Sequence, residues 1–129
     1  MRLERIHHIA IICSDYEASK YFYTAILGLK IVREVYREER RSWKCDLEVD
    51  GIYQVELFSF PDPPARQSRP EGCGLRHLAF EVDDLDSAVR ELTEKGIIVE
   101  PIRKDETRGG KRVTFFPDPD GLPLELCEN

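Results

Sequence analysis

Two histidines and two glutamates carry the chemistry that this sequence is able to do. His8 and His77 each open a short apolar segment, and Glu56 and Glu125 each lie inside another one. An ionised carboxylate in a buried strand has to be paired, protonated or bound to a metal, because burying it bare costs more than a domain's net stability. Two imidazoles and two carboxylates form a mixed nitrogen and oxygen ligand set, which suits Ni, Zn, Co, Mn or Fe better than calcium or a thiolate metal. The four residues therefore indicate a site for a divalent ion whose identity stays open.

Each of the four residues has a simpler interpretation when it is taken alone. A strand histidine is more often a hydrogen-bonded core residue than a ligand, and a single glutamate can point to solvent. His7 differs from His8, because neighbouring residues of a strand project to opposite faces, and we expect it at the surface. What favours a metal site is that a single repeat accounts for all four positions.

The repeat has an offset of 69 residues. Segment 8–11 (HIAI) aligns with 77–80 (HLAF), and segment 55–57 (VEL) aligns with 124–126 (LEL). A repeat that occurs twice indicates a duplicated module of about 60 residues rather than a solenoid. If the two modules pair about a pseudo-twofold axis, the two histidines and the two glutamates converge on one point.

Each module is predicted to fold as β-α-β-β-β. The first helix follows the capping-box pattern of Ser14 and Glu17 and ends before Gly28, and the second helix is opened by Asp84 and closed by Gly96. Apolar runs and alternation predict strands over 6–13, 30–37, 43–49 and 53–60 in the first module, and over 76–82, 97–103, 111–116 and 123–127 in the second, where the helix spans about 84–95. We therefore expect a single α+β domain over 1–129, with modules 1–60 and 76–129 and a proline-rich connector 61–75.

Composition narrows the function classes. The chain has 129 residues, of which 34% are charged, and a net charge of −6, which argues against a nucleic-acid partner because phosphate binding needs clustered Lys and Arg. No segment is long and apolar enough to span a membrane, and no secretory signal opens the chain, so a cytoplasmic location is expected. The 4 cysteines are dispersed and indicate neither a disulfide framework nor a zinc knuckle.

The chain resembles the vicinal oxygen chelate superfamily, the group of glyoxalases, bleomycin-resistance proteins and dioxygenases, over nearly its whole length. The similar motifs are 8–11 (HIAI) with Asp15, 22–23 (FY), 27–29 (LGL), 55–57 (VEL), 76–80 (RHLAF) with Val82 and Asp84, and 118–121 (DPDG) with 125–126 (EL). Within the superfamily the chain is similar to bacterial glyoxalase I and, over 36–38 (YRE) and 42–44 (SWK), to the bacterial YaeR-type branch. The resemblance implies two βαβββ modules in a curved mixed sheet around one divalent ion held by His8, Glu56, His77 and Glu125. It also implies a homodimer, whose metal site lies within one chain or is shared by two.

The resemblance also narrows the reaction. Extradiol dioxygenases and fosfomycin-modifying enzymes carry two His and one Glu, and the epimerase branch has Gln at the position of Glu56. The full set therefore favours a glyoxalase I-like lyase or isomerase that acts on a small oxygenated substrate through a metal-stabilised enediolate. Glu125 is the expected base, and Glu56 is the symmetry-related alternative.

Two positions argue against glutathione as the co-substrate. Ile12 and Phe60 stand where glutathione-using relatives carry Arg and Asn, and together with Phe58 they make that end of the cavity apolar. Charged and aromatic residues of the following hairpin are candidates for an anion clamp and a stacking surface: Arg37, Arg40, Arg41, Trp43 and Lys44. A solvated charged hairpin is the simpler interpretation of the same residues. Two interpretations also apply to the arginines near the connector, which either gate a site or are ordinary loop arginines: Arg66, Arg69 and Arg76.

Two other functions remain open on the sequence. One is a module that binds or sequesters a small molecule without turnover, with or without a metal. The other is an Fe(II) extradiol-type dioxygenase, in which Glu56 does not ligate and two His and one carboxylate leave positions open for O₂.

Overall fold

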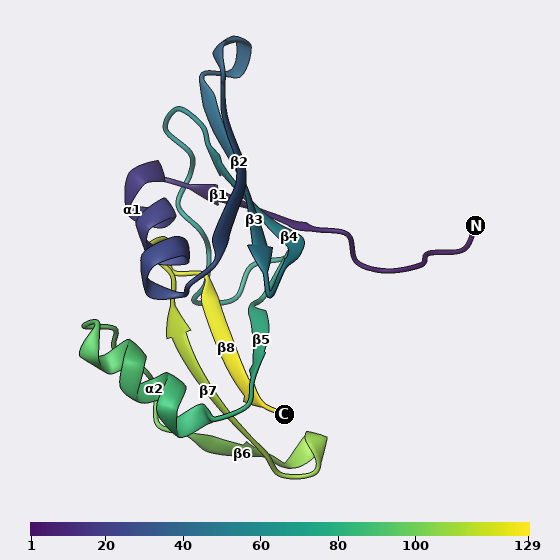
Figure 1. The fold of residues 1–129 in the computed structure, drawn as a ribbon, viewed down its shortest axis with the longest axis vertical. Coiled ribbons are helices and arrows are strands. Elements are labelled where there is room, and N and C mark those ends of the chain that lie inside the picture. Colours follow the sequence, from purple (N-terminus) through teal and green to yellow (C-terminus); the bar gives the residue numbers. More distant parts are fainter. The chain divides into compact units, whose positions relative to one another are not determined.

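A computed structural model describes all residues, 1–129, and divides the chain into two compact units, Met1–Ala65 and Arg66–Asn129. Each unit contains one four-stranded mixed sheet with a helix inserted after its first strand (Figure 1). The predicted α+β fold of two βαβββ modules is confirmed. No helix of the chain is both long enough and apolar enough to cross a membrane.

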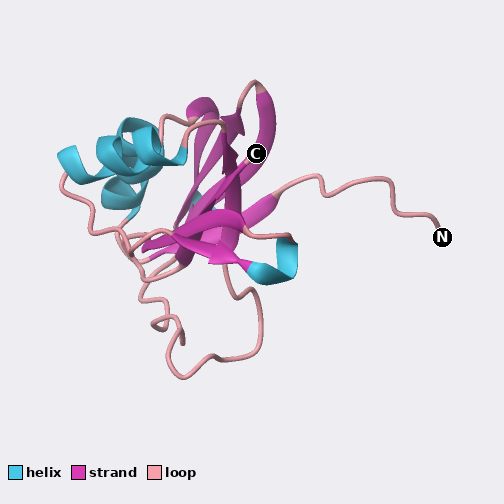
Figure 2. Cartoon of the chain, turned by 90° about the horizontal axis from the view of Figure 1, so that it is seen from below, coloured by secondary structure: helices cyan, strands magenta, loops and turns pink.

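The first unit begins with an extended loop that leads into its first strand (Figure 2). Its elements are β1 (Ile9–Cys13), α1 (Tyr16–Tyr21), a π-helical turn η1 (Phe22–Ile26), β2 (Lys30–Arg37), a 3₁₀ turn η2 (Glu38–Arg40), β3 (Ser42–Val49) and β4 (Ile52–Ser59). The strand order is β1-β4-β3-β2, and β1 runs parallel to β4 while the other neighbours are antiparallel.

The second unit repeats this topology. Its elements are β5 (Leu78–Val82), α2 (Leu85–Glu94), β6 (Arg103–Asp105), a 3₁₀ turn η3 (Glu106–Arg108), β7 (Lys111–Pro117) and β8 (Pro123–Glu128), in the order β5-β8-β7-β6. The register is repeated as well, since Ala10 pairs with Glu56 in the first unit and Ala79 pairs with Glu125 in the second. The offset of the sequence repeat is therefore preserved in the strand pairing.

Side chains from one face of each sheet form the core against the helix. Fully buried Tyr23, Leu47 and Leu57 belong to the first unit, and Leu85 and Leu124 to the second. Because successive strand residues point to opposite faces, the residues that alternate with this apolar set lie together on the other face of each sheet. Glu56 and Glu125 are on that face.

The first helix begins one residue later than the capping-box pattern predicts, whereas the second is capped by the predicted residue, Asp84. Asp15, not Ser14, is the N-cap of α1, and its side chain accepts a hydrogen bond from the backbone N–H of Ala18 at 3.1 Å. Asp84 caps α2 in the same way through the N–H of Ser87 at 2.9 Å. Both aspartates have the extended backbone conformation that an N-cap residue needs.

Three strands begin later than predicted. The strand predicted over 97–103 is β6 (Arg103–Asp105), so only Arg103 of the predicted range is paired, because Pro101 has no N–H to donate and the preceding chain contributes a single bond, from Glu100 N–H to the Phe115 carbonyl at 2.9 Å. The strand predicted from residue 76 starts at Leu78. The strand predicted from residue 6 starts at Ile9. The rings of His7 and His8 both pack against Tyr53, so the expectation that they project to opposite faces is wrong.

Candidate metal centre

The first unit brings His8 and Glu56 together. Glu56 lies in the middle of β4, and His8 immediately precedes β1, the strand that runs parallel to β4. His8 Nε2 is 3.6 Å from Glu56 Oε2, and Glu56 is only 6% exposed. The register places Ala10 level with Glu56, and His8, two residues before Ala10, lies on the same face as Glu56.

The second unit brings His77 and Glu125 together at equivalent positions. His77 immediately precedes β5, and its Nε2 lies 3.0 Å from Oε2 of Glu125 in β8. Glu125 is 5% exposed. The His77 and Phe115 rings pack edge to face, with a centroid distance of 5.4 Å, and this contact helps to orient the imidazole.

The structure assembles these residues as two pairs. Within the chain it forms no group of three or more His, Cys, Asp or Glu side chains that could hold a metal ion. Each unit therefore holds one imidazole beside one buried carboxylate.

Glu56 is held by further polar contacts that the sequence did not reveal. Its Oε1 accepts a hydrogen bond from the Tyr53 hydroxyl and lies 2.9 Å from Lys44 Nζ, and Lys44 also donates to Asp46. Burial by itself raises the pKa of Glu56, but the hydrogen bonds from Tyr53 and Lys44 outweigh it and hold the pKa below its usual value. Burial and the bond to Glu56 raise the pKa of Tyr53 to about 12. Glu56 is therefore an ionised, firmly tethered carboxylate.

Glu125 has fewer constraints. Its Oε1 is 3.1 Å from Nη1 of Arg108, a residue of the turn η3 whose side chain is 44% exposed. The repeat offset places Val113, Phe115 and Leu122 where the first unit has Lys44, Asp46 and Tyr53. These three positions are apolar in the second unit, and the ion-pair partners of Glu125 are His77 and Arg108.

A pocket of about 260 Å³ opens over the second pair. Both His77 and Glu125 line it, together with Phe115, three basic residues and two acidic ones: Arg76, Arg103, Lys104, Asp105 and Glu106. Arg76 Nη1 also lies 3.0 Å from His77 Nδ1. The pair is thus accessible to a small molecule.

Most of the predicted pocket residues of the first unit share one face. Ile12, Phe58 and Lys44 are neighbours across β1, β4 and β3. Phe58 and Phe60 stack at 6.0 Å, and the guanidinium of Arg37 lies 4.9 Å from the Phe58 ring. This surface therefore carries both apolar and cationic side chains, although Lys44 is already paired with Glu56 and Asp46.

Trp43 is on the other face. Its ring stacks on Tyr16 of α1 at 5.5 Å and packs against Tyr36 at 5.1 Å. Because Trp43 and Lys44 are consecutive in β3, they point in opposite directions, and the structure does not bring the two together.

Sequence reasoning missed Asp46, Tyr53 and Arg108. Asp46 stands between Cys45 and Leu47 in an apolar run, so the argument that selected Glu56 applies to it equally. Arg108 lies in a turn between two strands, where neither hydrophobic periodicity nor composition distinguishes it from other loop arginines.

The comparisons with known proteins agree with this architecture. The family model "Glyoxalase/Bleomycin resistance protein/Dioxygenase superfamily" matches residues 5–126. The chain is 66% identical over 128 residues to the uncharacterized protein YwkD of Bacillus subtilis, covering 99% of each chain, and 60% identical over 126 residues to the uncharacterized protein YaeR of Escherichia coli, covering 98% of this chain and 97% of YaeR.

A solved structure extends the agreement to three dimensions. The glyoxalase family protein from Enterococcus faecalis superposes with a TM-score of 0.90 at 47% identity, covering 99% of this chain and all of that one. A more distant relative is the lactoylglutathione lyase of Salmonella typhimurium, 26% identical over 127 residues, with 96% of this chain and 92% of the lyase covered. The chain belongs to the glyoxalase, bleomycin-resistance protein and dioxygenase superfamily, as a relative of the YaeR and YwkD proteins.

Proposed function

We propose that the protein is a divalent-metal-dependent lyase or isomerase of the glyoxalase I type. The observation that carries the proposal is the duplicated pair: each unit sets one imidazole against one buried carboxylate at equivalent positions. The distant similarity to lactoylglutathione lyase supports the reaction class.

The donor set fits a divalent ion. Two imidazole nitrogens and two ionised carboxylates suit Ni, Zn, Co, Mn or Fe, and no cysteine thiol is part of either pair. The ligands proposed are His8, Glu56, His77 and Glu125. When bound, the ion would act as a Lewis acid that polarises an oxygen of the substrate.

Glu125 is the proposed base. A base must change partners while it moves a proton between adjacent carbons, and Glu125 Oε1 is held only by Arg108 on an exposed turn. Glu56, the alternative, has both Tyr53 and Lys44 on its Oε1. The pocket over His77 and Glu125 gives the substrate access to this carboxylate.

The small substrate we propose is not a glutathione conjugate. Ile12 and Phe58 are neighbours across β1 and β4, and Phe58 stacks on Phe60, so this part of the first unit presents an apolar surface rather than the Arg and Asn of glutathione-using relatives.

Turnover of hemithioacetals made from several thiols tests the reaction. We expect the metal-loaded protein to convert at least one of them, and Glu125→Gln to lower the rate by about 10²-fold or more. An Arg90→Gln variant, altered on exposed α2, serves as the control. Failure of every hemithioacetal to react would overturn the lyase proposal.

One observation favours a second candidate, an Fe(II) oxygenase. Glu56 is already paired with Lys44 and hydrogen-bonded to Tyr53. This suits a protein in which Glu56 does not bind iron and the ligands are two His and one carboxylate, namely His8, His77 and Glu125. Oxygen uptake after anaerobic iron loading separates the candidates. Uptake that survives Glu56→Gln would favour the oxygenase over the isomerase.

We also propose that the two pairs act on one ion, within a chain or across a homodimer. Mixing His8→Ala with His77→Ala protein under conditions of subunit exchange distinguishes the arrangements. If the centre is shared, each mixed dimer regains one intact centre, and about a quarter of the metal capacity returns. If the centre lies within one chain, none returns.

A further inference from the structure

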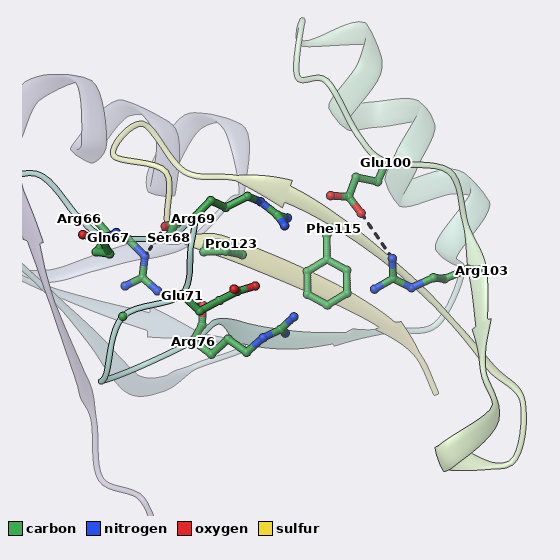
Figure 3. Close-up of a pocket in the computed structure, with 11 residues that line it drawn as sticks. Arg66, Gln67, Ser68, Arg69, Glu71, Arg76, Glu100, Arg103, Phe115 and Pro123 are labelled. Atoms are coloured by element: carbon green, nitrogen blue, oxygen red, sulfur yellow. Dashed lines mark hydrogen bonds and ion pairs between the residues drawn. The ribbon is translucent and has the colours of Figure 1, made fainter.

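A second pocket of the second unit has no role in the proposed reaction so far. It encloses about 360 Å³ and is lined by residues of the loop before β5 and of the sheet, among them Arg66, Arg69, Arg76, Arg103 and Phe115 (Figure 3). Together with Glu71 and Glu100, the four arginines give its lining a net charge of +2, in a chain whose net charge is −6. Such a local concentration of positive charge attracts anions.

Two of the arginines, Arg69 and Arg103, are available to a ligand, while Arg76 Nη1 lies 3.0 Å from His77 Nδ1. Figure 3 shows Arg69, Arg76 and Arg103 around the ring of Phe115. Arg69 makes no side-chain hydrogen bond or ion pair, and Arg103 has only a solvent-exposed pair with Glu100 at 3.5 Å, a kind that contributes little. Glu71 lies between Arg69 and Arg76 in this view and offsets part of their charge.

The fourth arginine braces the loop. Arg66 donates to Ser68 Oγ at 2.8 Å and to the carbonyl oxygens of Leu75 and Arg76. Ser68 Oγ in turn donates to the Gly121 carbonyl at 2.8 Å, which ties the loop to the turn between β7 and β8. The guanidinium of Arg69 is therefore presented by a pre-organised loop, which reduces the ordering cost of binding.

This pocket adjoins the His77 and Glu125 pocket. The two share Arg76, Arg103 and Phe115. The Phe115 ring lies 5.0 Å from the Arg103 guanidinium and 5.4 Å from the His77 ring. A molecule held at the arginines can therefore extend along Phe115 to Glu125.

We propose that the arginine pocket binds an anionic oxygen group of the substrate, a phosphate or a carboxylate, and so positions the rest of the molecule at His77 and Glu125. Guanidinium groups suit both anions, because their N–H donors form paired hydrogen bonds to two oxygens. The inference rests on the proposed function, since it defines the substrate class of the same site. The substrate is then a small organic anion that carries its reactive oxygens at the end remote from the anionic group.

Calorimetric titration of the full-length, metal-loaded protein with phenyl phosphate, benzoate and inorganic phosphate tests the proposal. We expect saturable binding of phenyl phosphate or benzoate. Arg69→Gln and Arg103→Gln should each weaken it about tenfold, because each variant removes a charge-assisted hydrogen bond. Arg90→Gln is the matched control, because it removes the same charge from the exposed face of α2, and its affinity should equal that of the wild type. Preference for phenyl phosphate would identify a phosphorylated substrate, and preference for benzoate a carboxylate.

Three results would overturn the proposal: no saturable binding of any probe, an equal loss in Arg90→Gln, or loss of metal together with probe binding in Arg69→Gln. The metal content of each variant keeps this test separate from that of the proposed function. Binding that depends on the arginines in a protein unable to hold metal would refute the metal enzyme and leave the anion pocket standing. A protein that holds metal but binds no probe would refute only the anion pocket.

Discussion

Lys44 is the cation that compensates two buried carboxylates, and its replacement by Met tests the electrostatics of the first unit. Its Nζ contacts Asp46 and lies 2.9 Å from Glu56 Oε1, and the Lys44 side chain is only 18% exposed. Asp46 retains Arg33 at 3.0 Å, but that arginine is 69% exposed and screened by solvent. Lys44→Met therefore leaves Glu56 with His8 and Tyr53 as its only partners.

The expected cost is about 2–3 kcal/mol in the metal-free protein, somewhat below the range for breaking a fully buried ion pair because Arg33 remains and Lys44 is not fully buried. Urea unfolding followed by circular dichroism measures it, with exposed Lys30→Met as the control for loss of one charge. A divalent ion should restore part of the lost stability, because it supplies positive charge at Glu56. Equal stability of the Lys44→Met and Lys30→Met variants would refute this view of Glu56 as a carboxylate that depends on Lys44.

Two further predictions concern stability. Hydrogen bonds from Tyr16 and Lys20 lower the pKa of Glu34, so the stability that Glu34 contributes is present above the ordinary carboxyl pKa and is lost as the pH falls through the lowered value. The urea midpoint of Glu34→Gln should therefore lie below that of the wild type at pH 7 and approach it in acid. A difference that stays constant with pH would contradict the assignment. Asp84→Ala removes the N-cap bond to Ser87 N–H and should cost about 1 kcal/mol, measured by thermal unfolding, whereas Asp83→Ala, one residue earlier, should cost much less.

The sequence predicted the architecture because the repeat constrains it at two levels. The offset that aligns His8 with His77 also aligns Glu56 with Glu125, and it reappears as the register of β1 with β4 and of β5 with β8. The strand periods and the glycine after each helix then predicted the order of elements. Element boundaries were less accurate, because they depend on individual backbone donors such as the one that Pro101 lacks.

The candidate site was predicted only in part. The four His and Glu positions follow from the repeat, but their partners break it, since Lys44, Asp46 and Tyr53 have apolar counterparts in the second unit. The alternation of side chains along a strand predicts that Trp43 and Lys44 point to opposite faces. Their aromatic and charged character nevertheless suggested a shared surface, which the structure does not form. The arginine pocket depends on how a proline-rich loop folds back, which composition alone does not determine.

Metal content, measured by elemental mass spectrometry on protein purified without an affinity tag, tests the central claim most directly. We predict a single divalent ion per set of four ligands in the wild type. Its amount should be strongly reduced in all four ligand variants, His8→Ala, Glu56→Gln, His77→Ala and Glu125→Gln, and unchanged in Arg90→Gln. Iron that survives Glu56→Gln but not His77→Ala would point to the three-ligand oxygenase instead. No bound metal after repletion with Ni, Zn, Co, Mn and Fe would contradict the metal-enzyme account and favour a small-molecule binding module.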